Sequence, residues 1–539
     1  MSQKVISFEK MPGSRKLFLD FLAGKTTDYF HYDFNSDSAL QQVHDKVKQR
    51  RYDREKIVAA LLRQNQAFGA GPKTIDNINR LLDPATSAVF TGQQVTLFGG
   101  PLFTFYKASL AIKLAESNCR KLAGTVVPIF WLAADDADFE EVAKITVPTA
   151  DNKMANLSWE PATPISGQPM GSVRLDEKIV ELLDAYEQTL PETEFRAELM
   201  ATLRECYQPG ESVVTAFGKY LCKIFADRGL VLIDPTDPVF RELALPIFRK
   251  EVQLREKAAK LVEERNSRLE QQGYHLQVAR PGSYSNLFYY NGKRTRIDFA
   301  EGGFAIEGKF VSQTDLEAML EKSPSLFSPN VFLRSIVQSH MFPTLVYFAG
   351  PAEAAYFSQI KELFDVFDEA APIIYPRYSA TIIEPAIARL MEKLEISFED
   401  ALQDLGHLTN EILKRTFPSD FEQRFATLRE EVKRQMDEIA VHLDQSDHGL
   451  ITNANRIAGR LDLEIKNLEE KVFQAHRKKN QTLRAQVERV AFSLFPDGKM
   501  QERSFPLNYY IAKYGPSVVD TLYDAVDCNS KVHHLISLE

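Results

Sequence analysis

The stretch VFTGQQVTLFGGPLFTFYKASLAIKLA, residues 89–115, decides the fold class of this 539-residue chain. An apolar run ends at Phe90 and a helical pattern begins near Leu102, which predicts a strand, a loop and a helix. The loop carries Gly99 and Gly100. Glycines let the backbone approach a ligand, and the free amides of a helix N-terminus favour an anion. A tight connection that needs glycine only for its shape explains the loop equally well, since the stretch matches neither a Walker loop nor GxGxxG.

Further short apolar runs alternate with helical segments along the chain. They are TVVPIFWLAA (125–134), GLVLI (229–233), PTLVYFAG (343–350), APIIYP (371–376) and ATIIEP (380–385). Such runs predict an α/β fold with a buried parallel sheet and helices on its faces. In this fold class the ligand crevice lies beyond the carboxyl ends of the strands.

Composition restricts the class of protein. With 44% hydrophobic and 26% charged residues the chain is ordinary for a globular protein, and its length predicts two or more domains. A net charge of -9 disfavours a nucleic-acid partner, and the basic run 476–479 is read as a solvated helix face. The four scattered cysteines form no CxxC pair. No apolar run has signal-peptide or membrane-spanning character, so a cytoplasmic protein without membrane contact is expected.

Residues 391–490 contain no Trp or Tyr and only one proline, Pro418, which is expected to break the first helical arm. Apolar residues recur every three or four positions, with a phase slip between Ala475 and Leu483, which predicts a coiled-coil hairpin with a stutter. DQSDHGLITN (444–453) is the predicted tip. The second arm, about 43 residues, would be roughly 65 Å long. Its exposed seam predicts a homodimer formed through this region.

Three domains follow from these patterns. Residues 1–387 form a core with inserted connecting segments, 388–494 form the helical coiled coil, and 495–539 form a C-terminal segment that docks back on the core.

Polar residues gather in three segments that follow predicted strands. These are TGQQ (91–94) with Lys107, FWLAADDADFEEV (130–142), and SPNVFLRSIVQSHMFPTLVYFAGPAEAAYF (328–357). Together with ERSFPLNYYIAKYG (502–515), and in the same order, they resemble the bacillithiol-biosynthesis cysteine-adding enzymes, a family of cysteine ligases. The match runs from about residue 88 to 515.

The resemblance implies a Rossmann-like core related to class I aminoacyl-tRNA synthetases, with connecting insertions and a long projecting coiled coil that promotes dimerisation. It implies ATP-linked addition of cysteine to glucosaminyl-malate, the last step of bacillithiol biosynthesis, with ATP or ADP as cofactor and Mg²⁺ accompanying the nucleotide. It also implies a nucleotide site near the coiled coil. No metal site made by the protein alone is predicted. HIGH and KMSKS signatures are not visible, so an aminoacyl-adenylate mechanism rests on analogy.

Amide formation requires donors for phosphate and carboxylate oxygens, an acceptor for an ammonium group, and a general base. The predicted substrate-binding residues are Thr91, Gly92, Gln93, Gln94, Trp131, Arg334, Glu353 and Tyr356. For Glu353 the alternative is a first-turn acid that stabilises its own helix. Lys107 lies two turns into the helix, where it faces either the site or away from it.

The predicted catalytic residues are Asp135, Asp136, Asp138 and His340. The three carboxylates would bind an ammonium, a hydroxyl pair or Mg²⁺, or else would only decorate a helix N-terminus. Changing the functional one to Asn is expected to leave the fold as stable or slightly more stable. Ala137 stands where the family usually has His, and Ser339-His340 stands where it usually has Asp after Gln. His340 therefore either compensates for the missing histidine or is a surface histidine.

The tail supplies the predicted nucleotide-binding residues, which are Tyr510, Lys513, Tyr514 and Gly515. Aromatic rings and a lysine could hold a purine and a phosphate, and a hydrophobic plug against the core is the equal alternative. The replaced residues at 137 and 340 also favour a second class of function, a non-catalytic nucleotide-binding or scaffold protein. A tRNA-directed enzyme that grips RNA with the hairpin is the third, and the net negative charge disfavours it.

Overall fold

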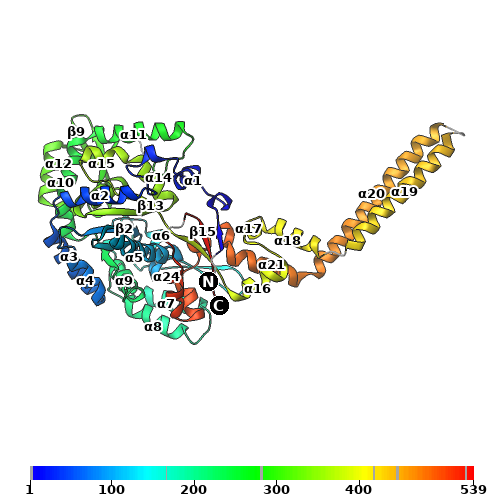
Figure 1. The fold of residues 1–539 in the computed structure, drawn as a ribbon, viewed down its shortest axis with the longest axis horizontal. Coiled ribbons are helices and arrows are strands. Elements are labelled where there is room, and N and C mark those ends of the chain that lie inside the picture. Colours follow the sequence, from blue (N-terminus) through cyan, green and yellow to red (C-terminus); the bar gives the residue numbers. More distant parts are fainter. Residues whose placement is uncertain (1–3, 166, 280–282, 417–418, 445–447, 529–530) are drawn as a thin grey trace. The chain divides into compact units, whose positions relative to one another are not determined.

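The computed structural model describes residues 4–165, 167–279, 283–416, 419–444, 448–528 and 531–539. The chain divides into two compact units. Unit 1 consists of Met1–Ile382 and Lys499–Ile536, and unit 2 consists of Ile383–Gly498 and Ser537–Glu539. The elements carry the labels of Figure 1.

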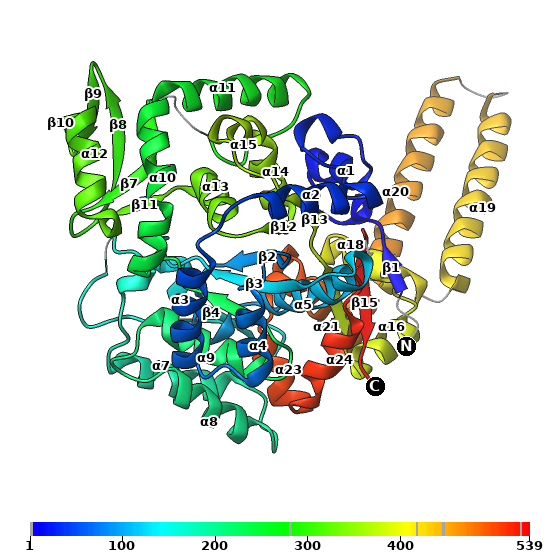
Figure 2. The ribbon, with the colours of Figure 1, turned by 60° about the vertical axis from the view of Figure 1, so that its left-hand side comes forward.

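A five-stranded parallel sheet forms the centre of unit 1, and its strands lie side by side in the order β13-β12-β2-β3-β6 (Figure 2). The strands are β2 (Ser87–Gln93), β3 (Val126–Leu132), β6 (Val231–Ile233), β12 (Thr344–Ala349) and β13 (Ile373–Pro376). Numbered by their order along the chain, they run 5-4-1-2-3. This is the Rossmann order, in which the strand order reverses between the first and fourth strands while all strands stay parallel. The predicted Rossmann-like parallel sheet is confirmed.

Apolar composition explains why these runs become central strands. All seven residues of β3 are buried, as are the six of β12. One strand boundary differs from the sequence prediction. β2 continues through Gln93, where a loop was predicted, because Gly92 and Gln93 pair with Trp131 and Leu132 of β3. At Gly92 a Cβ would lie 2.8 Å from the Trp131 carbonyl oxygen, so the close pairing requires glycine.

The run at 380–385 was wrongly assigned to the parallel sheet. It forms β14 (Ser379–Ile383), which belongs to a separate three-stranded sheet with β1 (Lys4–Ile6) and β15 (His533–Ser537). Although β13 and β14 are close in sequence, Arg377 and Tyr378 separate them and redirect the chain. An apolar run predicts a buried strand but does not say which sheet the strand joins.

The remaining elements of unit 1 surround these sheets. A five-stranded antiparallel sheet has the order β10-β9-β8-β7-β11, and β4 pairs with β5 in a separate two-stranded sheet. The other strands are β4 (Lys144–Pro148), β5 (Met154–Ser158), β7 (Tyr284–Tyr290), β8 (Arg294–Ala300), β9 (Gly303–Ile306), β10 (Lys309–Ser312) and β11 (Phe327–Pro329). The helices are α1 (Lys16–Leu22), α2 (Asp37–Gln49), α3 (Arg54–Ala67), α4 (Pro72–Arg80), α5 (Leu102–Leu122), α6 (Phe139–Ala143), α7 (Lys178–Thr189), α8 (Arg196–Cys206), α9 (Val213–Ile224), α10 (Pro238–Leu254), α11 (Glu256–Gln271), α12 (Gln313–Lys322), α13 (Val331–Met341), α14 (Pro351–Gln359), α15 (Lys361–Phe367), α22 (Gln501–Ser504), α23 (Leu507–Tyr514) and α24 (Ser517–Ala525).

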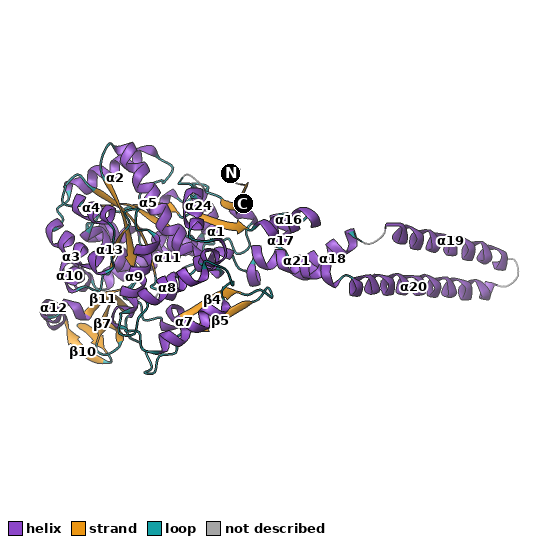
Figure 3. Ribbon diagram, turned by 90° about the horizontal axis from the view of Figure 1, so that it is seen from below, coloured by secondary structure: helices purple, strands orange, loops and turns teal. Residues whose placement is uncertain are grey.

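Unit 2 is helical, and its two longest helices lie side by side as a hairpin (Figure 3). Its helices are α16 (Pro385–Leu394), α17 (Phe398–Ala401), α18 (Leu405–Arg415), α19 (Ser419–Asp444), α20 (His448–Lys479) and α21 (Gln481–Leu494). Arg429 Nε donates to Asp462 Oδ1 at 2.7 Å and links α19 to α20. The predicted coiled coil is confirmed. Pro418 and part of the predicted tip, 445–447, lie outside the described residues.

The second arm is not the single helix of about 43 residues that was predicted. It ends at Lys479 and restarts as α21 at Gln481, with Asn480 outside helical geometry between them. The break falls inside the phase slip between Ala475 and Leu483. An apolar pattern that slips in phase cannot stay on one face of a straight helix, so the helix breaks there. Throughout the described residues, no helix combines the length and apolarity that a membrane span needs.

Candidate functional site

A cavity of about 410 Å³ lies where four strands of the parallel sheet end. Gln93 closes β2, Asp136 follows β3, Glu353 follows β12 and Arg377 follows β13, and all four line this cavity, here termed the polar pocket. It therefore occupies the carboxyl edge at the reversal of strand order, as the fold class predicts.

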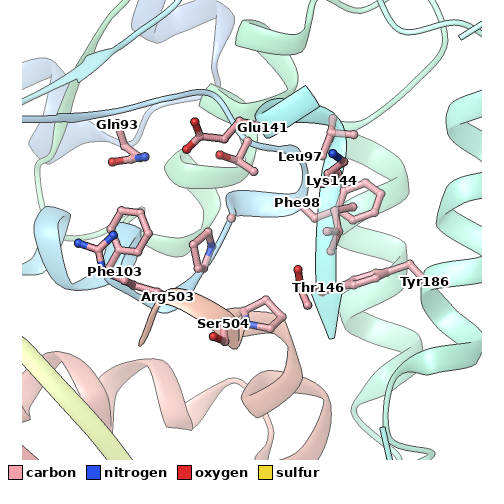
Figure 4. Close-up of a pocket in the computed structure, with 15 residues that line it drawn as sticks. Gln93, Leu97, Phe98, Phe103, Glu141, Lys144, Thr146, Tyr186, Arg503 and Ser504 are labelled. Carbon is pink, nitrogen blue, oxygen red and sulfur yellow. The ribbon is translucent and has the colours of Figure 1, made fainter. Parts of the chain in front are cut away.

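A second cavity of about 330 Å³, here termed the adjoining pocket, borders the first. The two share Gln93, Phe103, Glu141 and Arg503. In Figure 4, Gln93 and Glu141 lie on one side of the adjoining pocket, and Arg503 lies on the opposite side. These four residues form the junction between the pockets.

Lys107 faces the polar pocket, which settles the question that its sequence position left open. Its buried Nζ donates to Gly92 O at 3.1 Å, to Gln93 Oε1 at 3.0 Å and to Glu353 Oε1 at 2.6 Å. Glu353 Oε2 also accepts from Gly350 N at 3.1 Å, so Glu353 lines the pocket and caps its own helix α14 as well. Burial alone would raise the pKa of Glu353, but Lys107 overrides it and holds that pKa at about 2.

No residue of the short helix α22 was predicted as a site residue, yet this helix forms one wall of the two pockets. Gln501 bonds both backbone groups of Ile382, accepting from N at 2.8 Å and donating to O at 2.9 Å. Glu502 is fully buried and accepts from Arg377 Nη2 at 2.6 Å and from Ser379 Oγ at 3.0 Å. Arg503, the next residue, then lines both pockets. The sequence signal was the polar segment 501–503 itself. Its sequence pattern did not show which distant residues these side chains contact.

Three cations surround one aromatic ring in this wall. Lys107, Arg377 and Arg503 lie 5.4, 5.7 and 5.6 Å from the ring centroid of Phe103. Arg377 lowers the pKa of Arg503 by repulsion between the two guanidinium groups. Within the described residues Arg503 has no ion-pair partner, whereas Lys107 and Arg377 are paired with Glu353 and Glu502. The wall therefore presents one guanidinium, that of Arg503, without a contacting carboxylate among the described residues, which suits a phosphate or carboxylate group.

The three predicted catalytic aspartates have three different environments. Asp135 is buried and paired with Arg241, which is buried too. Asp138 caps α6 by accepting from the Glu141 backbone N–H at 3.2 Å. Asp136 alone lines the polar pocket, and its Oδ1 lies 4.0 Å from Arg294 Nη1. Of the three candidates only the Asp136 side chain reaches the cavity, as expected for at least one of them, and the catalytic roles of the three stay predictions.

Glu141 was missed as a site residue, although it lies in the same acidic segment. With its amide nitrogen turned toward Glu141, Gln94 donates to both carboxylate oxygens at 2.7 Å. Gly92, Gln93, Gln94 and Trp131 line the polar pocket as predicted. Thr91 does not line the pocket, and its side chain is fully buried.

Arg334 and Tyr356 also line the polar pocket, together with Tyr347, whose hydroxyl lies 3.4 Å from that of Tyr356. His340 does not line it. Its Nδ1 lies 2.8 Å from Glu369 Oε1, and Glu369 also accepts from Arg50. Six residues beyond Arg334 on α13, His340 is about 9 Å further along the helix axis. The prediction of His340 as a catalytic residue is not supported by this placement.

The predicted nucleotide-binding residues lie on α23 and at Gly515, which follows it, outside the lining of both pockets. Tyr510 is fully buried, and Lys513 Nζ donates to Tyr509 Oη at 3.0 Å. A Cβ at Gly515 would lie 3.0 Å from Phe195 Cε1, so the backbone packs closely against the core. This packing agrees with the hydrophobic plug, the alternative to a nucleotide site. No cluster of three or more His, Cys, Asp or Glu side chains suited to a metal ion occurs in the described part of the chain.

Comparison with known proteins gives consistent results for nearly the whole chain. Residues 1–378 match the family model described as bacillithiol biosynthesis BshC, N-terminal Rossmann-like domain, and residues 380–538 match the C-terminal coiled-coil domain of the same family. A protein from Koribacter versatilis named "Putative cysteine ligase BshC" is 32% identical over 96% of this chain and 97% of its own length. Relatives of the same name from Salinibacter ruber (31%, 97% of this chain and 96% of theirs) and Symbiobacterium thermophilum (33%, 88% of each) are also similar.

Proposed function

The chain belongs to the bacillithiol biosynthesis BshC family, and we propose that it is a cysteine ligase that joins cysteine to glucosaminyl-malate in the cytoplasm, using ATP. The observation that carries this proposal is the mixed charge of the polar pocket. Lys107, Arg334, Arg377 and Arg503 line it together with Asp136, Glu141 and Glu353. A zwitterionic amino acid and an anionic conjugate need both kinds of partner.

The wall around Phe103 fits the triphosphate of ATP. Arg503 has no ion-pair partner among the described residues and lines both pockets, so it would meet phosphate oxygens, with Arg377 beside it. ATP would supply the activation that amide formation in water requires. Mg²⁺ would arrive with the nucleotide rather than in a site made by protein ligands.

The first test is a reaction of the purified protein with cysteine, glucosaminyl-malate and ATP, followed by mass spectrometry of the thiol product and of the nucleotide. Formation of the amide with consumption of ATP is expected. Arg503→Ala is expected to lower kcat/KM at least 10-fold, since a charge-assisted contact to a phosphate contributes about 1.5–3 kcal/mol. Wild-type protein that binds the three compounds without forming an amide would instead support a non-catalytic binding protein.

We also propose a homodimer formed through the hairpin. Leu450, Ile457, Leu461 and Leu468 on α20 are exposed although they repeat at helical spacing. A second copy of the chain would cover this apolar stripe.

Light scattering is therefore expected to give twice the monomer mass. Leu461→Asp with Leu468→Asp should yield a monomer, whereas Glu464→Gln, an exposed change on the same helix, should not. A wild-type monomer at micromolar concentration would contradict the proposal.

A further inference from the structure

We propose that Glu141 is the general base that takes the proton from the attacking amine of the amino sugar. This inference rests on the proposed ligase function and adds to it the residue that accepts the proton. It follows from where Glu141 lies between the two cavities and from how its neighbours are engaged.

Position is the first argument. Glu141 lines both the polar pocket and the adjoining pocket. Of the carboxylates that line either cavity, Asp136 and Glu353 line the polar pocket alone. Two substrates held in neighbouring cavities must meet at the junction between them. A base at that junction can reach the amine of one substrate while it attacks the carbonyl of the other.

Three other carboxylates of the region are already committed. Glu353 is ion-paired with Lys107 and accepts from Gly350 N, and its pKa of about 2 makes it a poor proton acceptor. Asp135 is buried against Arg241. Asp138 is occupied as the cap of α6. Glu141 accepts instead from the neutral amide of Gln94, and no cation among the described residues forms an ion pair with it.

The charged neighbours of Glu141 favour proton uptake. Partial burial raises its pKa first, and the negative charges of Asp138 and Asp136 raise it further. The hydrogen bond from Gln94 and the positive charge of Arg503 act in the opposite direction, and the net shift of the pKa is upward. Lys144 also lines the adjoining pocket, with its Nζ held 3.2 Å from Glu140 Oε2. Glu141 remains accessible to solvent, so a substrate amine can reach it.

The step balances as follows. Cysteine, activated as an acyl phosphate or acyl adenylate by ATP, presents a carbonyl carbon to the amine. The amine nitrogen forms the new C–N bond, the C–O bond to the phosphate group breaks, and that electron pair leaves with the phosphate. The proton lost by the amine passes to the Glu141 carboxylate and then to water.

Glu141→Gln keeps the shape and the hydrogen bond to Gln94 but removes the base. It is expected to lower kcat by about 10²–10⁴-fold, while the dissociation constants of cysteine and the conjugate stay close to wild type. The acidic limb of the kcat/KM–pH profile, which reports Glu141 becoming protonated, should disappear. Glu140→Gln is the matched control, because it removes one carboxylate from the same helix at an exposed site, and it should retain both rate and profile.

A second variant tests the base without removing it. Gln94→Ala deletes a hydrogen bond that lowers the pKa of Glu141, so the acidic limb should move to higher pH. An unchanged limb in Gln94→Ala, or wild-type kcat in Glu141→Gln, would overturn the inference. A loss confined to KM in Glu141→Gln would overturn it too, since that result marks a binding residue. Absence of amide formation by the wild type would instead overturn the proposed function.

Discussion

Replacing Asp135 with asparagine is expected to destabilise unit 1 by about 3–5 kcal/mol, the cost of removing one partner of a buried ion pair. Asp135 is 6% exposed, and so is its partner Arg241. The variant would leave a guanidinium buried without a counter-charge, because asparagine offers only a neutral oxygen. The sequence-based expectation of an unchanged or more stable fold concerned the functional aspartate, and for Asp135 the buried pair with Arg241 predicts the opposite.

Urea unfolding of three variants measures the effect and supplies its controls. Asp138→Asn should change the free energy of unfolding by less than about 0.5 kcal/mol, because asparagine caps a helix as well as aspartate does. Asp136→Asn should also be small, since this side chain lines a cavity and its contact with Arg294 is long. Equal stabilities for all three variants would show that the buried pair contributes no more than an exposed one.

The contrast among the three aspartates shows what the sequence can and cannot predict. Apolar runs predicted all five strands of the parallel sheet, since burial on both faces leaves a local signature in composition. The same local pattern placed an acidic segment at the sheet's carboxyl edge. The pattern did not predict which carboxylate would pair with Arg241, because that arginine lies on α10, more than 100 residues away in the sequence.

Long-range pairing also explains the other misses. Gln501 and Glu502 act through Ile382 and Arg377, residues more than 100 positions earlier, so no periodicity connects them. His340 was a candidate because it could compensate for the histidine that the family usually has at position 137, but its position on α13 places it beside Glu369. The helix break at Asn480, by contrast, was visible in the sequence as a phase slip and was read only as a stutter.

Lys107→Met is expected to lower both stability and activity, because Lys107 joins the Gly92–Gln93 strand end to Glu353. Methionine fills a similar volume but leaves the Glu353 carboxylate without its contacting cation. The free energy of unfolding is expected to fall by about 3 kcal/mol at neutral pH. In the double variant Lys107→Met/Glu353→Gln the loss should be smaller than the sum of the single losses, by about 0.5–3 kcal/mol, as for contacting residues.

The dependence of this loss on pH identifies its cause. In the wild type the pKa of Glu353 is held at about 2, below its ordinary value of 4.5. The pair therefore stabilises the fold above about pH 4.5, and that contribution disappears as the pH falls toward 2. Without Lys107, burial raises the pKa of Glu353. As the pH falls, Glu353 therefore becomes protonated at a higher pH in the variant than in the wild type, and this protonation removes the cost of burying its unpaired charge. The stability difference between the two proteins should accordingly be largest at neutral pH and shrink in acid. A difference that stays constant from neutral pH to about pH 3 would mean that Lys107 stabilises the fold by packing alone, and that Glu353 is held by its bond to Gly350 rather than by the lysine.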